Sequence, residues 1–226
     1  MSRIILKGLA VSLGLFAGLA SAKSSQITEI EANNTLSTAQ NIDNYFSLSS
    51  NDDILNSTTV PHVSILGFGP QGSEAPSFDF YSFTVTTAGL GIFDIDYGRR
   101  GDASNGTETL GCPGAGPGCI DPFLKLVDAA GNLIVANDNS PVANGAGGSF
   151  STGDSFISYF FTLVPDTYFI RVSEKGPVPL NSIDSNYLLQ VSIENHAVVV
   201  PEPATLALFG IGLLGLGAAR RQRQST

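Results

Sequence analysis

The sequence predicts an all-β protein, an antiparallel β-sandwich with a different kind of segment at each end of the chain. Short runs of alternating apolar and polar residues recur through the middle of the chain, which is typical of strands with one buried face. Turn-forming Gly, Asn, Asp and Pro separate these runs. Outside the two ends, apolar residues do not repeat at helical spacing over two turns, so no helical layer is expected.

The expected elements follow from these runs in order. YSFTV places Tyr81, Phe83 and Val85 on one face, and DAAGN indicates a hairpin turn with Gly131 at positive φ. The expected strands span 81–85, 91–97, 122–128, 132–138, 155–164, 167–174 and 186–194. The segment NNTLSTAQNI (33–42) is short enough for one helical turn, and surface loops are expected at 51–77, 98–120 and 139–154.

The first residues have the pattern of a secretory signal peptide. Arg3 and Lys7 precede an apolar run that ends in the triplet Ala20 to Ala22, ASA. A positive start, an apolar middle and an A-x-A site together mark a segment for export and removal. We therefore expect cleavage after Ala22, with residues 1–22 removed and residues 23–199 left as the exported β-sandwich domain.

The last residues combine a short motif, an apolar segment and a basic tip. Residues 204–219 carry no charge, and at about 1.5 Å per helical residue they span roughly 24 Å, slightly less than a hydrocarbon core of about 30 Å. A buried helix of the core is the alternative, but an arginine cluster suits a cytoplasmic membrane face better. We expect a transmembrane helix over 204–219. It is flanked by Val200, Pro201, Glu202 and Pro203, and by Arg220, Arg221 and Arg223.

This arrangement resembles the PEP-CTERM sorting signal, which is also catalogued as an ice-binding-protein C-terminal domain. The resemblance covers only residues 200–226. It implies export across the inner membrane of a Gram-negative bacterium, transient anchoring there, and processing by an exosortase before the protein reaches the cell surface or extracellular matrix. Family members often accompany exopolysaccharide machinery, so exopolysaccharide is a second expected partner.

A further resemblance covers residues 29–194. The segments EIEANNTLSTAQNI, FDFYSFTVTTAG, DPFLKLVDAAGNLIVANDN, DSFISYFFTLVPDTYFIRVSE and NYLLQVSI occur in one order. Together they resemble the bacterial pre-peptidase C-terminal domain, which implies a jelly-roll-like β-sandwich, either appended to secreted peptidases or standing alone in exported proteins. One departure is Ser77, at a place where the family usually has an acidic residue.

Acidic and amide residues at the start of the exported domain form a candidate calcium site. Calcium takes six to eight oxygen ligands from carboxylates, amide carbonyls and the backbone. In an extended segment Glu29 and Glu31 point to one side, where they can face Asp79. Some members of the resembling family hold calcium with such an arm, and the resemblance extends this role to Glu29, Glu31, Asn33, Asn34 and Asp79. The alternative is a polar leader capped by Asn34, and Ser77 would weaken a calcium site.

Two cysteines stand close together in CPGAGPGC. Because an exported protein folds in an oxidising compartment, Cys112 and Cys119 are expected to form a disulfide. A metal site would require further Cys or His nearby, and His62 and His196 are far away in the sequence.

The net charge and the absence of catalytic motifs narrow the classes of function that the sequence allows. Between positions 23 and 203, six basic residues stand against all 20 acidic residues, a net charge of −14 that repels nucleic acid and anionic lipid. The sequence contains no HExxH, G-x-S-x-G or P-loop motif. We therefore expect a non-catalytic surface or matrix protein. The alternatives are a calcium-dependent carbohydrate-binding module, and a glycosidase or peptidase-accessory domain.

Overall fold

The computed structural model describes residues 26–69, 76–96, 121–144, 153–175, 179–180 and 187–198. All of them belong to one compact unit, residues 23–200. The expected signal peptide (1–22), the pair Cys112 and Cys119, and the segment 200–226 lie outside the described residues. Within the described ranges, no helix is long and apolar enough to cross a membrane.

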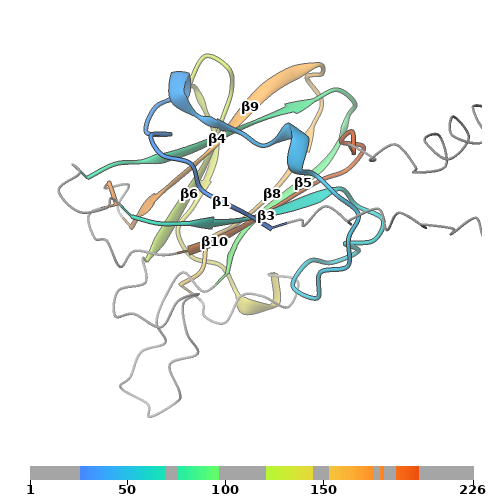
Figure 1. Cartoon of the computed structure of the whole chain (residues 1–226), viewed down its shortest axis with the longest axis horizontal. Coiled ribbons are helices and arrows are strands. Elements are labelled where there is room, and N and C mark those ends of the chain that lie inside the picture. Colours follow the sequence, from blue (N-terminus) through green and yellow to red (C-terminus); the bar gives the residue numbers. More distant parts are fainter. Residues whose placement is uncertain are drawn as a thin grey trace, which may run out of the picture. The chain divides into compact units, whose positions relative to one another are not determined.

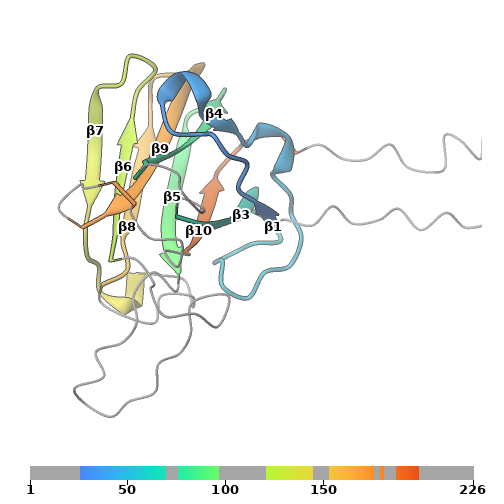
Figure 2. The same cartoon turned by 60° about the vertical axis from the view of Figure 1, so that its left-hand side comes forward.

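The described strands form two five-stranded sheets (Figures 1 and 2). The first sheet has the order β1-β3-β10-β5-β8, made of β1 Gln26–Thr28, β3 His62–Gly67, β10 Tyr187–Ile193, β5 Gly89–Asp96 and β8 Phe156–Phe161. The second has the order β2-β4-β9-β6-β7, made of β2 Gln40–Asn41, β4 Asp79–Val85, β9 Asp166–Glu174, β6 Pro122–Val127 and β7 Leu133–Asn137. Short 3₁₀ helices lie between strands at η1 Leu36–Thr38, η2 Asp43–Tyr45 and η4 Val142–Asn144.

The apolar core lies between the two sheets. Alternate side chains of each strand point inward, so Phe83 of β4 meets Phe93 of β5 with ring centroids 5.4 Å apart. Phe161 of β8 lies edge-on to Phe83 at 5.9 Å and packs on Tyr168 of β9 at 4.6 Å. Each of these pairs joins one sheet to the other, which gives the sandwich-like arrangement that the sequence predicts.

The strands expected from the sequence are present as β4 to β10, with shifted ends. The block 51–77, expected to be a loop, contains the additional strand β3. Five of the six residues of β3 are buried, because the loop before it packs on its outer face, where Asn51 Nδ2 donates to Ser64 Oγ at 3.2 Å. A strand buried on both faces lacks the polar–apolar alternation that marks a half-buried strand.

The two sheets are mixed, whereas the sequence predicts antiparallel sheets throughout. β1 runs parallel to β3, and β2 runs parallel to β4. The other described pairs are antiparallel. Both parallel strands belong to one N-terminal arm, which adds three residues to the edge of one sheet and two to the edge of the other. Strands this short carry no alternation from which a direction could be predicted.

The hairpin between β6 and β7 is confirmed. Gly131 has φ +83°, a conformation that favours glycine. Asp128 Oδ1 fixes the turn by accepting hydrogen bonds from Ala130 N at 2.9 Å and Asn132 N at 2.8 Å. The helical turn expected in 33–42 is also present, as the 3₁₀ helix η1.

Candidate metal centre in the N-terminal arm

The arm crosses from one sheet to the other at residues 29–34. Glu29 extends the β1–β3 ladder, because its N–H donates to Leu66 O at 2.9 Å. Further along, Asn33 O accepts a hydrogen bond from Phe80 N of β4 at 3.0 Å. Between these two anchor points, the arm joins an edge of the first sheet to an edge of the second.

Three carboxylates meet at this crossing. One oxygen from each of Glu29, Glu31 and Asp79 lies within 4.8 Å of the other two. Asp79 is fully buried at the start of β4, Glu29 is 9% exposed, and Glu31 is exposed to solvent. The structure therefore brings together the three acids that the sequence singles out, with one of them accessible from outside.

Two amide oxygens of the same arm are also buried acceptors. The Oδ1 atoms of Asn33 and Asn34 and the Oδ1 of Asp79 are buried and have no hydrogen-bond partner. Asn33 Nδ2 donates to Glu29 Oε1 at 2.6 Å, so the amide is oriented by the carboxylate. Buried acceptors without donors are rare and call for an ion or water. Carboxylate and amide oxygens are the ligands that calcium takes, so the residues fit that ion.

Two tyrosine hydroxyls connect the carboxylates to the core. Tyr81 of β4 donates to Glu29 Oε1 at 3.0 Å, and Tyr187 of β10 donates to Asp79 Oδ2 at 2.6 Å. The two hydroxyl oxygens lie 2.6 Å apart. Gly67 makes room for this pair, because a Cβ there would lie 2.1 Å from the Tyr187 ring. Neither tyrosine was predicted to contact the carboxylates, because an inward position on a strand indicates core packing and does not reveal a hydroxyl contact.

The electrostatics of the crossing disfavour so much negative charge without a cation. Burial, followed by the charge of Glu29, raises the pKa of Asp79 well above its ordinary value. Burial also raises the pKa of Glu29, although hydrogen bonds from Phe68 N, Asn33 and Tyr81 oppose the effect. A divalent cation would remove this cost by pairing with both carboxylates.

The polar-leader alternative also has a structural outcome. The N-cap of η1 is Thr35 and not Asn34, and the Thr35 backbone N–H donates a hydrogen bond to Thr38 Oγ1 at 3.1 Å. Ser77 is buried and joins Leu180 through backbone hydrogen bonds of 2.7 and 3.0 Å.

The turn NDN at 137–139 is also rich in side-chain oxygens, and its side chains contact neighbouring segments of the chain. Asn137 Oδ1 accepts from Phe156 N at 3.0 Å, and Asp138 Oδ2 lies 3.6 Å from Lys175 Nζ. These contacts occupy the side chains with structural hydrogen bonds and an ion pair, which favours a turn over a metal site.

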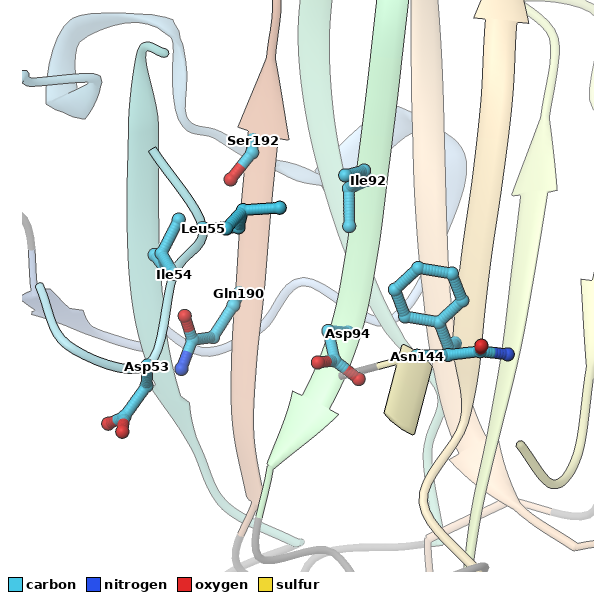
Figure 3. A pocket seen from close by; sticks show the side chains of 9 residues that line it. Asp53, Ile54, Leu55, Ile92, Asp94, Asn144, Gln190 and Ser192 are labelled. Carbon is cyan, nitrogen blue, oxygen red and sulfur yellow. The ribbon is translucent and has the colours of Figure 1, made fainter. Parts of the chain in front are cut away.

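A second group of acids lies on the outer face of the first sheet, beside a cavity of about 60 Å³ (Figure 3). Asp94 of β5 is the cross-strand partner of Gln190 of β10, and Asp96 points to the same side. Gln190 Nε2 donates to Asp96 Oδ2, while Asp96 Oδ1 and Gln190 Oε1 are buried without a partner. Burial, then the charges of Asp94, Asp53 and Asp154, raises the pKa of Asp96 to about 8. This group was not predicted, although the alternation in GIFDIDY places Asp94 and Asp96 on one face.

Comparisons with known proteins identify one motif and one structural likeness. The chain is similar to the crystal structure of the pre-peptidase C-terminal domain of collagenase from Bacillus anthracis, at 12% identity and a TM-score of 0.32, over 59% of this chain and 89% of that one. This is the family that the sequence resemblance named. No curated protein matches the chain. Residues 199–223 match the PEP-CTERM protein-sorting motif, so the chain carries the sorting signal of the PEP-CTERM family.

Proposed function

We propose that this chain is an exported surface or extracellular-matrix protein that an exosortase sorts and processes. The match of residues 199–223 to the PEP-CTERM protein-sorting motif carries the proposal. The signal-peptide pattern of residues 1–22 and the charge-free segment 204–219 support it, because they supply the export and membrane steps that such sorting needs. The processed protein would leave the inner membrane and associate with exopolysaccharide.

Fractionation of a Gram-negative host that has an exosortase tests this function. The wild-type chain is expected at the cell surface or in the medium, with Lys23 as its first residue. Pro201→Ala combined with Glu202→Gln is expected to retain the protein in the inner membrane. The matched control changes a proline and an acid outside the motif, Pro141→Ala with Asp52→Asn, and should be released normally. Release of both variants alike, or a cytoplasmic protein that still begins with Met1, would contradict the proposal.

For the exported domain, we propose a non-catalytic module whose arm is held by calcium. The carboxylates of Glu29, Glu31 and Asp79 and the amide oxygens of Asn33 and Asn34 would hold the ion. The ion would supply positive charge among these buried acceptors. Since the arm joins the edges of both sheets, calcium bound there would tie the two sheets together.

A calcium-dependent carbohydrate-binding module is the second candidate. One observation favours it: Glu31 is exposed while Asp79 is buried, so an ion held between them would keep an outward side for sugar hydroxyls. A glycan array probed with calcium and with chelator tests it, with Asp79→Asn as the variant. Glycan binding that is lost in chelator and in Asp79→Asn favours the carbohydrate-binding module. Glycan binding that is unchanged in both cases excludes it. Turnover of a polysaccharide would instead favour the glycosidase alternative.

A further inference from the structure

The outer face of the second sheet carries a row of side chains that crosses four strands. Arg171 of β9 is the cross-strand partner of Phe80 on β4 and of Lys125 on β6. Lys125 is in turn the partner of Ala136 on β7. Directly paired residues point to the same side of a sheet, and neighbouring strands lie about 4.8 Å apart, so the row spans about 14 Å. Figure 2 shows these strands side by side, with β7 at the edge.

The two cations of this row are held by aromatic rings. The Arg171 guanidinium lies 4.3 Å from the centroid of the Phe78 ring, and Lys125 Nζ lies 5.6 Å from that of Phe123. Neither cation forms an ion pair within the described part of the chain, where Lys175 and His196 make the observed pairs. Arg171 Nε and Nη2 are buried without a hydrogen-bond acceptor. Among the described residues, aromatic rings orient both charges and no carboxylate pairs with either.

The described strand positions beside this row carry no acid, although the domain has a net charge of −14. The acids at the end of this face, Asp121 and Asp138, each lie 3.6 Å from Lys175 Nζ. The strand positions that flank the row on the same side are Ser82, Phe169, Ser173, Phe123 and Val127. Burial, followed by the charge of Arg171, lowers the pKa of Lys125, as expected for two cations without a counter-ion. In an acidic domain, two adjacent positive charges with uncharged neighbours on their strands form a local site for an anion.

We propose that this face binds a carboxylate-bearing polysaccharide through Arg171 and Lys125. A guanidinium and an ammonium side by side suit carboxylates spaced along a polymer. Phe80, Phe123 and Phe169 are partly exposed on the same face and offer apolar surface to sugar rings. The overall negative charge opposes approach to a flat anionic membrane, whereas a polysaccharide strand need touch only this row of side chains. The inference rests on the proposed association with exopolysaccharide and names its ligand class and its surface.

Binding measurements on the full chain in detergent solution, with calcium present, test the inference. The probes are polygalacturonate, neutral dextran, dextran sulfate and vesicles that contain phosphatidylglycerol. The wild type is expected to bind polygalacturonate more tightly than any other probe, and less tightly as salt rises. Lys125→Gln and Arg171→Gln are each expected to weaken this binding about tenfold or more, as loss of about 1.4 kcal/mol requires. Lys175→Gln removes the same charge from an exposed residue that follows β9 and should keep wild-type affinity.

Each other outcome overturns the inference in a different way. Wild-type affinity in Lys125→Gln, whose melting temperature should equal that of the wild type, moves the binding surface elsewhere but leaves the association intact. Equal or tighter binding of dextran sulfate shows attraction by charge alone. A preference for vesicles makes the partner a membrane. If no polysaccharide binds, this inference and the exopolysaccharide association both fail, while fractionation of the motif variants still decides the sorting function separately.

Discussion

Two groups of buried acids in this domain differ in what surrounds them. At the arm, Glu29 and Asp79 accept hydrogen bonds from tyrosines and lie with Glu31 within 4.8 Å. On the outer face of the first sheet, Asp96 has like charges around it and one hydrogen bond from Gln190. The metal-like geometry of three carboxylates occurs only at the arm among the described residues. Burial raises the pKa of Asp79 at the arm and of Asp96 on the first sheet. The three converging carboxylates of the arm favour a bound cation, whereas the single carboxyl of Asp96 favours a bound proton.

Calcium at the arm is expected to give the largest effect. At a hundredfold excess over Kd, an ion that binds only the folded state adds about 2.7 kcal/mol to the free energy of unfolding. For a domain of this size, each kcal/mol raises the melting temperature by about 2–4 °C, so a shift of roughly 5–10 °C is expected. Calorimetric melts in millimolar calcium and in chelator measure it.

The acids of the arm provide the controls for this shift. Glu31→Gln and Asp79→Asn are expected to remove it, whereas Asp52→Asn, an exposed acid outside the arm, should leave it unchanged. Coincident wild-type melts with calcium and chelator would eliminate the site. A shift that persists in both arm variants would place the ion elsewhere in the domain.

Tyr187→Phe is expected to cost about 2 kcal/mol in calcium-free buffer, because Asp79 Oδ2 loses a buried donor. Urea unfolding measures the cost. Tyr159→Phe is the matched control, because no hydrogen bond of its hydroxyl occurs within the described residues, and it should cost much less. An equal loss in the two variants would mean that Tyr187 stabilises the fold by packing alone, so its hydroxyl would have no part in the arm network.

The Asp96 group is expected to respond to pH. The pKa of Asp96 is about 8 in the folded chain against an ordinary 3.8, so between these values the folded state binds more protons than the unfolded state. Stability therefore falls as pH rises from about 4 to 8, by up to about 1.4 kcal/mol per pH unit. The negative charges of Asp94, Asp53 and Asp154 contribute to the raised pKa after burial.

Urea unfolding at pH 6 and pH 7 tests this slope. Asp96→Asn is expected to reduce this slope, because an amide stays neutral over the whole range, and to be more stable than the wild type at pH 8. The raised pKa values of Asp79 and Glu29 account for the slope that remains. Asp52→Asn should keep the wild-type slope. If wild type and Asp96→Asn have the same slope, Asp96 is ionised in the folded domain and a cation becomes the better explanation there too.

The acids of the arm could be predicted from the sequence, but the strands and tyrosines around them could not. Alternating Glu29 and Glu31 and the acid that opens β4 could be predicted to meet, because extended segments place alternate side chains on one side. The direction of β1 and β2 could not, since strands of three and two residues have no periodicity. Tyr81 and Tyr187 lie 106 positions apart, and only the pairing of both sheets around one core brings their hydroxyls together.

For Asp94 and Asp96, the sequence predicts the face of the sheet but not the burial of the two side chains. The alternation in GIFDIDY places Asp94 and Asp96 on the outer face, where acids are usually solvated. Their burial depends on the loop before β3, which packs over that face through Asp53, Ile54 and Leu55 (Figure 3). That segment has no regular pattern, so its covering role could not be inferred from the sequence. The same loop hides β3, which explains why both features were missed together.

Asp43 is a third acid for comparison, because hydrogen-bond donors of the protein alone stabilise its charge. Its substitution is expected to change the free energy of unfolding least. Burial by itself would raise the pKa of Asp43, but hydrogen bonds from His196, Thr84 and Asn41 outweigh burial and lower the pKa to about 2. Because the folded pKa lies below the ordinary 3.8, the stabilisation is present above about pH 4 and is lost as pH falls towards 2. The side chain is partly exposed, so screening by solvent reduces the contribution to about 1 kcal/mol. Asp43→Asn should therefore be about 1 kcal/mol less stable than the wild type in urea at pH 7, and this difference in stability should disappear near pH 2.

Asp52→Asn is the control for Asp43→Asn and should show no such difference at either pH. A difference between wild type and Asp43→Asn that stays constant with pH would mean that Asp43 acts through its shape and not its charge. Hydrogen-bond donors alone would then not explain how this domain keeps a carboxylate ionised.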